Sequence, residues 1–154
     1  MTDTSMRFAW DDIPRPARVL GLAGIAPQAF AVIAALSPTW RFTALSAGFL
    51  YGALILSFVG GVWWGVASTN PKAPKWVYLV AVAPSLIALA TGIPWMVGAL
   101  WPWPSLAVLG TALMVSPIMD MKLRSLDLIS DAVLCFRIVL SVGIGIMTGL
   151  LAFL

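Results

Sequence analysis

Five apolar stretches fill almost the whole of this chain, and each is long enough to form a helix that crosses a lipid bilayer. A spanning helix needs about 20 apolar residues, because the hydrocarbon core is about 30 Å thick. Only 10% of the residues are charged, against about 25% in a typical soluble domain, and the mean hydropathy is +0.99. We therefore predict an all-α polytopic membrane protein, a five-helix transmembrane bundle, with spans at residues 17–36, 43–68, 76–93, 104–119 and 132–154.

Little of the chain remains outside these spans. A polar N-terminal arm (residues 1–16) precedes a single transmembrane domain (residues 17–154), and the loops are too short to hold a separate soluble domain. The first span is longer than the apolar core of a signal peptide, and no clear small-residue cleavage site follows it. We expect it to be retained in the mature protein.

The basic residues predict the orientation of the bundle. With five spans, the N-terminal arm lies on the same side as the second–third and fourth–fifth loops, and the cytoplasmic side of a membrane protein is enriched in Lys and Arg. Only Arg41 falls on the opposite side. We expect a cytoplasmic N-terminus and an outside C-terminus, with the cytoplasmic side holding Arg7, Arg15, Arg18, Lys72, Lys75, Lys122 and Arg124, and with Arg137 just inside the fifth span.

The tryptophans give an independent test of this topology. Trp prefers the membrane interface, where one edge of the ring is wet and the rest is apolar. All eight lie near predicted span ends, which favours two aromatic belts over a tryptophan ligand cage. Trp10, Trp63, Trp64 and Trp76 belong to the cytoplasmic belt, and Trp40, Trp95, Trp101 and Trp103 to the outer one.

Small residues at helical spacing predict how the helices pack, because helices in lipid associate through close backbone contact. The second span carries two such faces, so we place it at the centre of the bundle with neighbours on two sides. The fifth span carries another, which would pack against the second or first span or against a separate membrane protein. The two faces of the second span are Gly48 with Gly52, and Ala53, Ser57, Gly61 and Gly65; the face of the fifth is Ser141, Gly145 and Gly149.

The composition argues against catalysis and against a metal site. The chain has no histidine and no glutamate, which removes the commonest general base and metal ligand. One cysteine, Cys135, makes neither an internal disulfide nor a zinc site. The basic residues cluster at helix ends, so they argue for topology rather than for nucleic-acid binding. We therefore expect a non-catalytic protein with no cofactor required by any motif and no metal.

Three polar residues inside or beside the spans are candidates for a site. Asp120 and Arg137 lie on neighbouring spans and can pair, either as a structural ion pair or as a site for an anionic lipid or quinone head group. Gln28 lies midway along the first span beside Pro27, where a carbonyl freed by a proline, or Ser57, could accept from its amide. Pro27, with Pro84 and Pro117 in other spans, is expected to kink its helix.

Three segments carry a resemblance to a known family. They are IPRPARVLGLAGIAPQ (residues 13–28), YGALILSFVGGVWWG (residues 51–65) and LCFRIVLSV (residues 134–142). The chain resembles the uncharacterised small bacterial inner-membrane proteins whose eukaryotic relatives are a mitochondrial transmembrane protein. The resemblance covers most of the chain, and residues 57–65 are its most specific part. It implies a multi-pass protein of the bacterial inner membrane and no established activity.

One position departs from that family. Trp63 stands where the resemblance implies a residue that is often basic or a histidine, so a proton or anion role does not transfer to this position. The tryptophan-rich translocator proteins also have five spans and a similar length. Their characteristic loop is absent, since the second–third loop reads STNPKAPKW (residues 68–76), and the similarity is one of shape alone.

Two functional hypotheses follow. In the leading one, the chain is an accessory or assembly subunit of a larger inner-membrane complex, respiratory or photosynthetic, and acts through helix–helix contacts within the lipid bilayer. In the alternative, it binds or carries a hydrophobic small molecule such as a quinone, tetrapyrrole or lipid. A shared cavity for Gln28 and Ser57 would favour binding, and outward-facing small residues would favour partnership. The binding site would comprise Gln28, Ser57, Trp63, Asp120 and Arg137.

Overall fold

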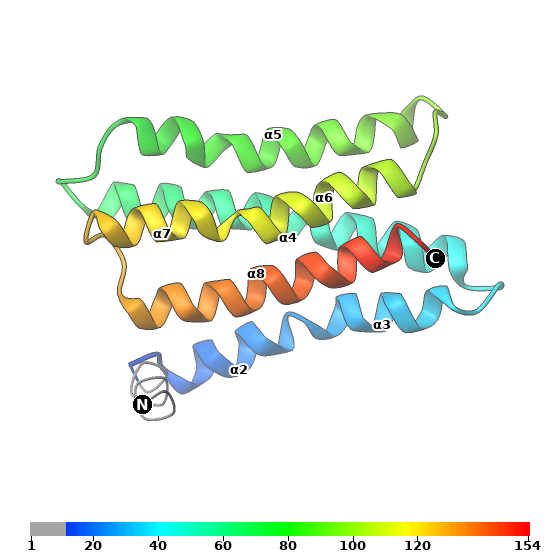
Figure 1. Cartoon of the computed structure of the whole chain (residues 1–154), viewed down its shortest axis with the longest axis horizontal. Helices are drawn as coiled ribbons and strands as arrows, with labels where there is room; N and C mark the ends of the chain where they lie inside the picture. The colour runs from blue at the N-terminus through cyan, green and yellow to red at the C-terminus, as the bar shows by residue number, and fades with distance from the viewer. Residues whose placement is uncertain (1–11) are drawn as a thin grey trace.

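The computed structural model describes residues 12–154, and within them every regular element is a helix. Residues 1–11, which include Arg7, Trp10 and most of the predicted N-terminal arm, lie outside the described part. Five helical spans confirm the predicted all-α membrane architecture (Figure 1). In chain order they are α2 (Arg15–Ala23) with α3 (Ala26–Ala35), α4 (Arg41–Thr69), α5 (Trp76–Met96), α6 (Trp103–Val115) with α7 (Pro117–Ser125), and α8 (Asp131–Leu151).

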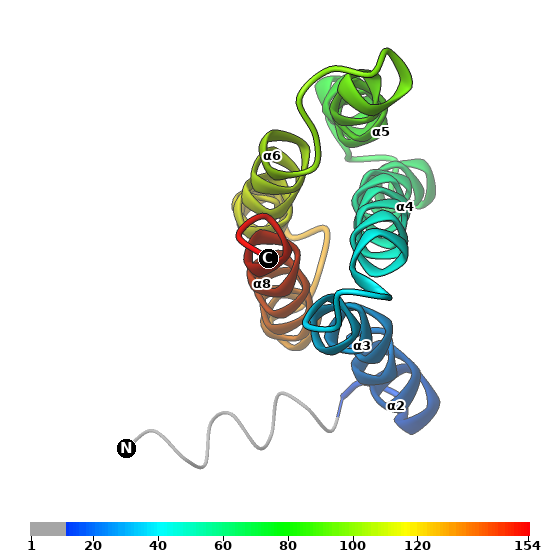
Figure 2. The same ribbon diagram turned by 90° about the vertical axis from the view of Figure 1, so that its right-hand side faces the viewer.

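The helices form two facing rows, as the end-on view in Figure 2 shows. One row contains α5, α4 and α3, with α2 at its edge, and the other contains α6 and α8. The most extensive contacts are α4 with α5, α6 with α8, and α3 with α4. The α2 helix buries none of its residues. The basic end of the bundle, where α4 and α7 end and α2, α5 and α8 begin, lies on the left in Figure 1, and the C-terminus lies at the other end.

Two of the predicted proline interruptions divide a span into two helices. Pro27 lies in the first turn of α3, just after the break at residues 24–25, and Pro117 begins α7 directly after α6. Proline suits the first turn of a helix, because the N–H that it lacks has no intrahelical partner there. Pro84 does not divide α5, which continues without a break to Met96 and also contains Pro94.

Glycines determine where helix backbones meet. At Gly110 of α6, an added Cβ would lie 2.8 Å from the Gly145 carbonyl oxygen and 2.8 Å from the Gly149 nitrogen. The small-residue face of α8 therefore packs on α6, and the expectation that it packs on the first or second span, or on another protein, was wrong. On α4, Gly52 approaches Leu109 and Thr148, and Gly48 approaches Leu151, as expected for a central helix.

The second small-residue face of α4 does not pack as expected. Gly61 and Gly65 are exposed, and no atom lies within 4 Å of a Cβ added at either position. The close approach of α5 occurs at Gly60, where a Cβ would collide with the Ala81 carbonyl oxygen. Successive residues point about 100° apart around a helix, so contact at Gly60 turns Gly61 away from α5.

Candidate functional site

Three of the five candidate binding residues meet in one buried cluster. Asp120 of α7 is 0% exposed, and its Oδ1 accepts hydrogen bonds from the indole Nε1 of Trp63 at 2.7 Å and from Nε of Arg137 at 2.8 Å. The Arg137 side chain is 12% exposed. This Trp63–Asp120–Arg137 cluster joins α4, α7 and α8 inside the bundle.

The break between α6 and α7 positions the carboxylate. Because α7 begins at Pro117, Asp120 lies in its first turn, where the helix dipole favours a negative charge. The Ser116 hydroxyl, at the break itself, donates to the Leu113 carbonyl at 2.8 Å and shares a hydrogen bond of 3.2 Å with the Ser141 hydroxyl of α8. These contacts hold the start of α7 against the helix that supplies Arg137.

The cluster leaves hydrogen-bonding capacity unused. Within the described residues, Asp120 Oδ2 and Arg137 Nη2 are buried and have no hydrogen-bond partner. Arg137 lies six residues into α8, about 9 Å along the helix, so the charge pair is well inside the span. An unsatisfied buried polar group costs about 1–3 kcal/mol, and more if charged, so the cluster could gain stability from a further hydrogen-bonding group.

An apolar groove reaches Arg137 from one side. This Arg137 groove has a volume of about 480 Å³ and lies between α2, α4 and α8. Among residues 12–154, Arg137 is its only charged lining residue, and Ser141 of the same helix also lines it. The other walls include Gly21 of α2, Gly24 at the α2–α3 break, and Phe58 and Val62 of α4.

A second apolar groove lies on the other side of Trp63. This Lys122 groove has a volume of about 510 Å³ and lies between α4, α5 and the α6–α7 pair. Its lining includes Trp63, Trp76, Pro84, Ser116 and Lys122. Trp63 is 4% exposed, lines this groove and donates its indole N–H to the Asp120 carboxylate. The expectation that it belongs to a lipid-facing aromatic belt was wrong.

The structure separates Gln28 and Ser57 from this cluster. Gln28 is 0% exposed, and its amide donates to the Gly48 carbonyl at 3.2 Å and to the Thr148 hydroxyl at 2.8 Å, which ties α3 to α4 and α8. The Ser57 hydroxyl instead pairs with Ser85 at 2.9 Å. They line neither groove, so they do not face one cavity, and Ser57 is not the partner of Gln28.

Two functional contacts were missing from the sequence reasoning. Thr148, which accepts from Gln28, lies seven residues after Ser141, two helical turns along the same face. That spacing places Thr148 on the same face of the helix as Ser141, but it does not identify Gln28 as its partner. Tyr51 donates its hydroxyl proton to the Gly24 carbonyl at the α2–α3 break, beside the Arg137 groove. The sequence predicted an interruption at Pro27, but it gave no signal that Tyr51 of another span would contact it.

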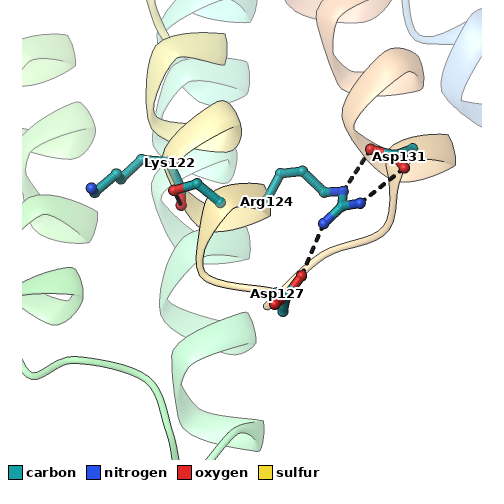
Figure 3. A network of polar contacts seen from close by, with 5 residues as sticks. Lys122, Arg124, Asp127 and Asp131 are labelled. Carbon is teal, nitrogen blue, oxygen red and sulfur yellow. Dashed lines mark hydrogen bonds and ion pairs between the residues drawn. The ribbon is translucent and has the colours of Figure 1, made fainter.

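A separate polar network closes the loop between α7 and α8, near the basic end (Figure 3). Arg124 makes two hydrogen bonds to Asp131, at 2.6 and 3.0 Å, and one to Asp127 at 3.0 Å. Ser130 caps α8 by accepting from the Val133 nitrogen at 3.3 Å. Asp127 and Asp131 are largely exposed, so this network fixes the loop and offers no enclosed site. No group of three potential metal-ligating side chains occurs in the described part of the chain.

Comparison with known proteins gives a family and one curated relative. The model of a family described as "Protein of unknown function (DUF3429)" matches residues 13–153. Transmembrane protein 69 of Xenopus tropicalis is 40% identical over 88 residues, which cover 52% of this chain and 33% of that protein. The chain thus matches about a third of the length of this relative. No solved structure matches. Because the family model covers nearly the whole chain, this five-span membrane protein belongs to the DUF3429 family.

Proposed function

We propose that this protein binds a lipid-soluble small molecule in the Arg137 groove. The observation that carries the proposal is the part-buried guanidinium of Arg137, which lines an apolar groove and whose buried Nη2 has no hydrogen-bond partner among the described residues. Ligand sites are mostly apolar pockets of about 300–1,000 Å³ with a few placed polar groups, and the groove of about 480 Å³ falls in that range.

The charge balance at the groove favours an uncharged ligand head. Asp120 lies 2.8 Å from Arg137 and neutralises it. A second anion would approach the buried carboxylate as well as the guanidinium, whereas a carbonyl oxygen would accept an N–H from Arg137 without adding charge. A quinone or an ester-bearing lipid therefore fits better than a free carboxylate.

The direct test measures what the purified protein carries. The protein would be extracted in mild detergent, its absorption spectrum recorded and its bound lipids analysed by mass spectrometry. Val62→Phe would fill the groove from α4, and Val82→Phe makes the same change at an exposed position on α5 that lines neither groove. We expect one quinone or neutral lipid to be retained by the wild type and Val82→Phe and lost from Val62→Phe. Equal retention by the two variants would contradict the proposal.

The accessory or assembly role is a second candidate, favoured by the exposed Gly61 and Gly65. They lie on the exposed side of α4 near Phe58 and Trp64, which are 67% and 48% exposed. Small residues let a partner helix approach closely in lipid. Gly61→Ile should release a stoichiometric partner protein in a native pull-down, and Leu54→Ile, at another exposed position of α4, should retain it. Retention by both would exclude this face.

The proposed location is the bacterial inner membrane with the N-terminus in the cytoplasm. It is supported by the charge distribution, since Lys72, Lys75, Lys122 and Arg124 lie at the basic end and Arg41 at the other. Reporter fusions at Leu154 and within residues 70–74 should report opposite sides of the membrane, with the C-terminus outside. The reverse pattern would overturn the orientation.

A further inference from the structure

The Lys122 groove has the depth of one membrane leaflet. Along α5 its lining extends from Trp76 to Ile87, and along the α6–α7 pair from Lys122 to Ala112. At 1.5 Å per residue these distances are about 16 Å and about 15 Å. The hydrocarbon core is about 30 Å thick, so the groove runs from the basic end to about the bilayer midplane.

A cation lies at the interfacial end of this groove. Lys122 is exposed, lines the groove, and makes no side-chain hydrogen bond or ion pair with the described residues. Figure 3 shows its ammonium directed away from the Arg124–Asp127–Asp131 network. Asp127 and Asp131 pair with Arg124, and neither forms an ion pair with Lys122 within the described residues.

Trp76 completes the interfacial end. It is 40% exposed, lines the groove opposite Lys122, and its indole N–H has no acceptor among residues 12–154. An indole at head-group level packs its ring on apolar groups and donates its N–H to polar ones. Below this level the α5 wall is apolar, with Val80, Ala83 and Pro84. The groove thus offers a cation and a donor at the surface and a hydrocarbon channel beneath.

We propose that the Lys122 groove holds one acyl chain of an anionic phospholipid, with the lipid phosphate on the Lys122 ammonium and the Trp76 indole. Charge complementarity selects the occupant, because a zwitterionic lipid would leave no net negative charge for an unpaired lysine. This site is distinct from the Arg137 groove, where the cation is already neutralised by Asp120.

The experiment compares two lysines at the same end of the bundle. Purified, delipidated protein would be titrated with phosphatidylglycerol or phosphatidylcholine, and bound lipid counted by native mass spectrometry. Lys122→Gln removes the charge that lines the groove, and Lys75→Gln removes a charge next to Trp76 that lines neither groove. A basic residue near an anionic lipid surface contributes about 1 kcal/mol, so we expect Lys122→Gln to weaken phosphatidylglycerol binding about fivefold and Lys75→Gln to have little effect.

A second pair of variants tests the acyl channel. Ala83→Phe places a ring in the groove, and Ala90→Phe makes the same change at an exposed position on α5 beyond it. Only Ala83→Phe should abolish the bound phosphatidylglycerol, and glycerol 3-phosphate, a head group without chains, should not displace it.

Three results would overturn the proposal. The first is an equal effect of Lys122→Gln and Lys75→Gln, which would indicate general surface electrostatics. The second is equal binding of the two lipids. The third is unchanged phosphatidylglycerol binding by Ala83→Phe together with loss of a co-purifying protein, which would assign the groove to a partner helix.

Discussion

Replacing Arg137 alone should destabilise the protein far more than replacing Arg137 and Asp120 together. Arg137→Met removes the cation and keeps an apolar side chain of similar length, but leaves the fully buried Asp120 carboxylate with one hydrogen bond, from Trp63. Breaking a buried ion pair by removing one partner costs about 3–5 kcal/mol. The total free energy of unfolding of a protein is about 5–15 kcal/mol, so a loss of this size should be readily measured.

The double variant Asp120→Asn, Arg137→Met should recover most of that loss. The asparagine Oδ1 can still accept from the Trp63 indole, which the structure places 2.7 Å away, and no unpaired charge remains. Replacement of a whole buried pair by neutral groups is often neutral or stabilising by about 1–4 kcal/mol. We expect the double variant to lie within about 2 kcal/mol of the wild type.

The relative stabilities of the wild type, Arg137→Met and the double variant can be measured by unfolding in detergent, followed by tryptophan fluorescence and by size-exclusion chromatography. If the Arg137 groove binds a ligand through the guanidinium, the double variant should be folded and yet carry no ligand, which separates function from stability. Additive losses in the single variants Arg137→Met and Asp120→Asn and in the double variant would refute the reasoning, because they would show that the two charges do not interact in the folded protein.

Three further predictions concern helix packing. Gly60→Ala should cost about 1–3 kcal/mol by overpacking, because its Cβ would meet the Ala81 carbonyl oxygen and lie 3.2 Å from Pro84. The control Gly61→Ala adds a Cβ in open space and should be neutral or slightly stabilising in the same unfolding assay. Gln28→Leu should cost about 1 kcal/mol, since hydrogen bonds inside membranes average about 0.6 kcal/mol, and should leave ligand retention unchanged; loss of ligand at full stability would contradict the separation of Gln28 from the site. Gly145→Ile should prevent folding, seen as aggregation on size-exclusion chromatography, because its Cβ already lies 2.6 Å from Met114 and 2.9 Å from the Gly110 oxygen.

The spans were predictable because hydropathy depends on the local sequence alone. Each predicted stretch corresponds to one spanning helix or helix pair, and the ends differ by a few residues. The largest difference is at the fourth span, which continues through α7 to Ser125 although the prediction ended at residue 119. The polar residues Lys122 and Arg124 lower the hydropathy there without ending the helix.

Helix neighbours were not predictable from small residues alone. Gly60 and Gly61 are adjacent and chemically identical, yet one contacts α5 and the other contacts no atom of the described structure. A pattern of small residues indicates that a helix face permits close packing, but it does not identify the helix that packs there. Gly110 of α6 is the missing partner of Gly145, and it lies in the span whose short apolar stretch gave the weakest sequence signal.

The polar candidates divide according to whether their partners are local. Asp120 and Arg137 lie on consecutive spans at the same end of the bundle, so their pairing followed from topology. The hydrogen bond from Trp63 to Asp120 joins residues 57 positions apart, and that from Gln28 to Thr148 joins residues 120 positions apart. Neither pairing is encoded in local spacing, because both depend on the order in which the helices face each other.

This division also changes which functional hypothesis the molecule favours. The sequence ranked partnership above ligand binding because it showed no catalytic motif, little mass outside the membrane and small-residue helix faces, and because the family that it resembles is located in the inner membrane. The structure separates Gln28 and Ser57 from the candidate binding site, which weakens the ligand-binding hypothesis. It also packs Gly145 against α6 inside the bundle, which weakens the partnership hypothesis. What remains for partnership is an exposed strip at Gly61 and Gly65, which lipid alone can cover. What remains for binding is a buried charge pair with unused hydrogen-bonding atoms beside an apolar groove. Lipid tails can cover exposed glycines at no cost but cannot satisfy a guanidinium, so the Arg137 groove carries the stronger requirement for a specific occupant.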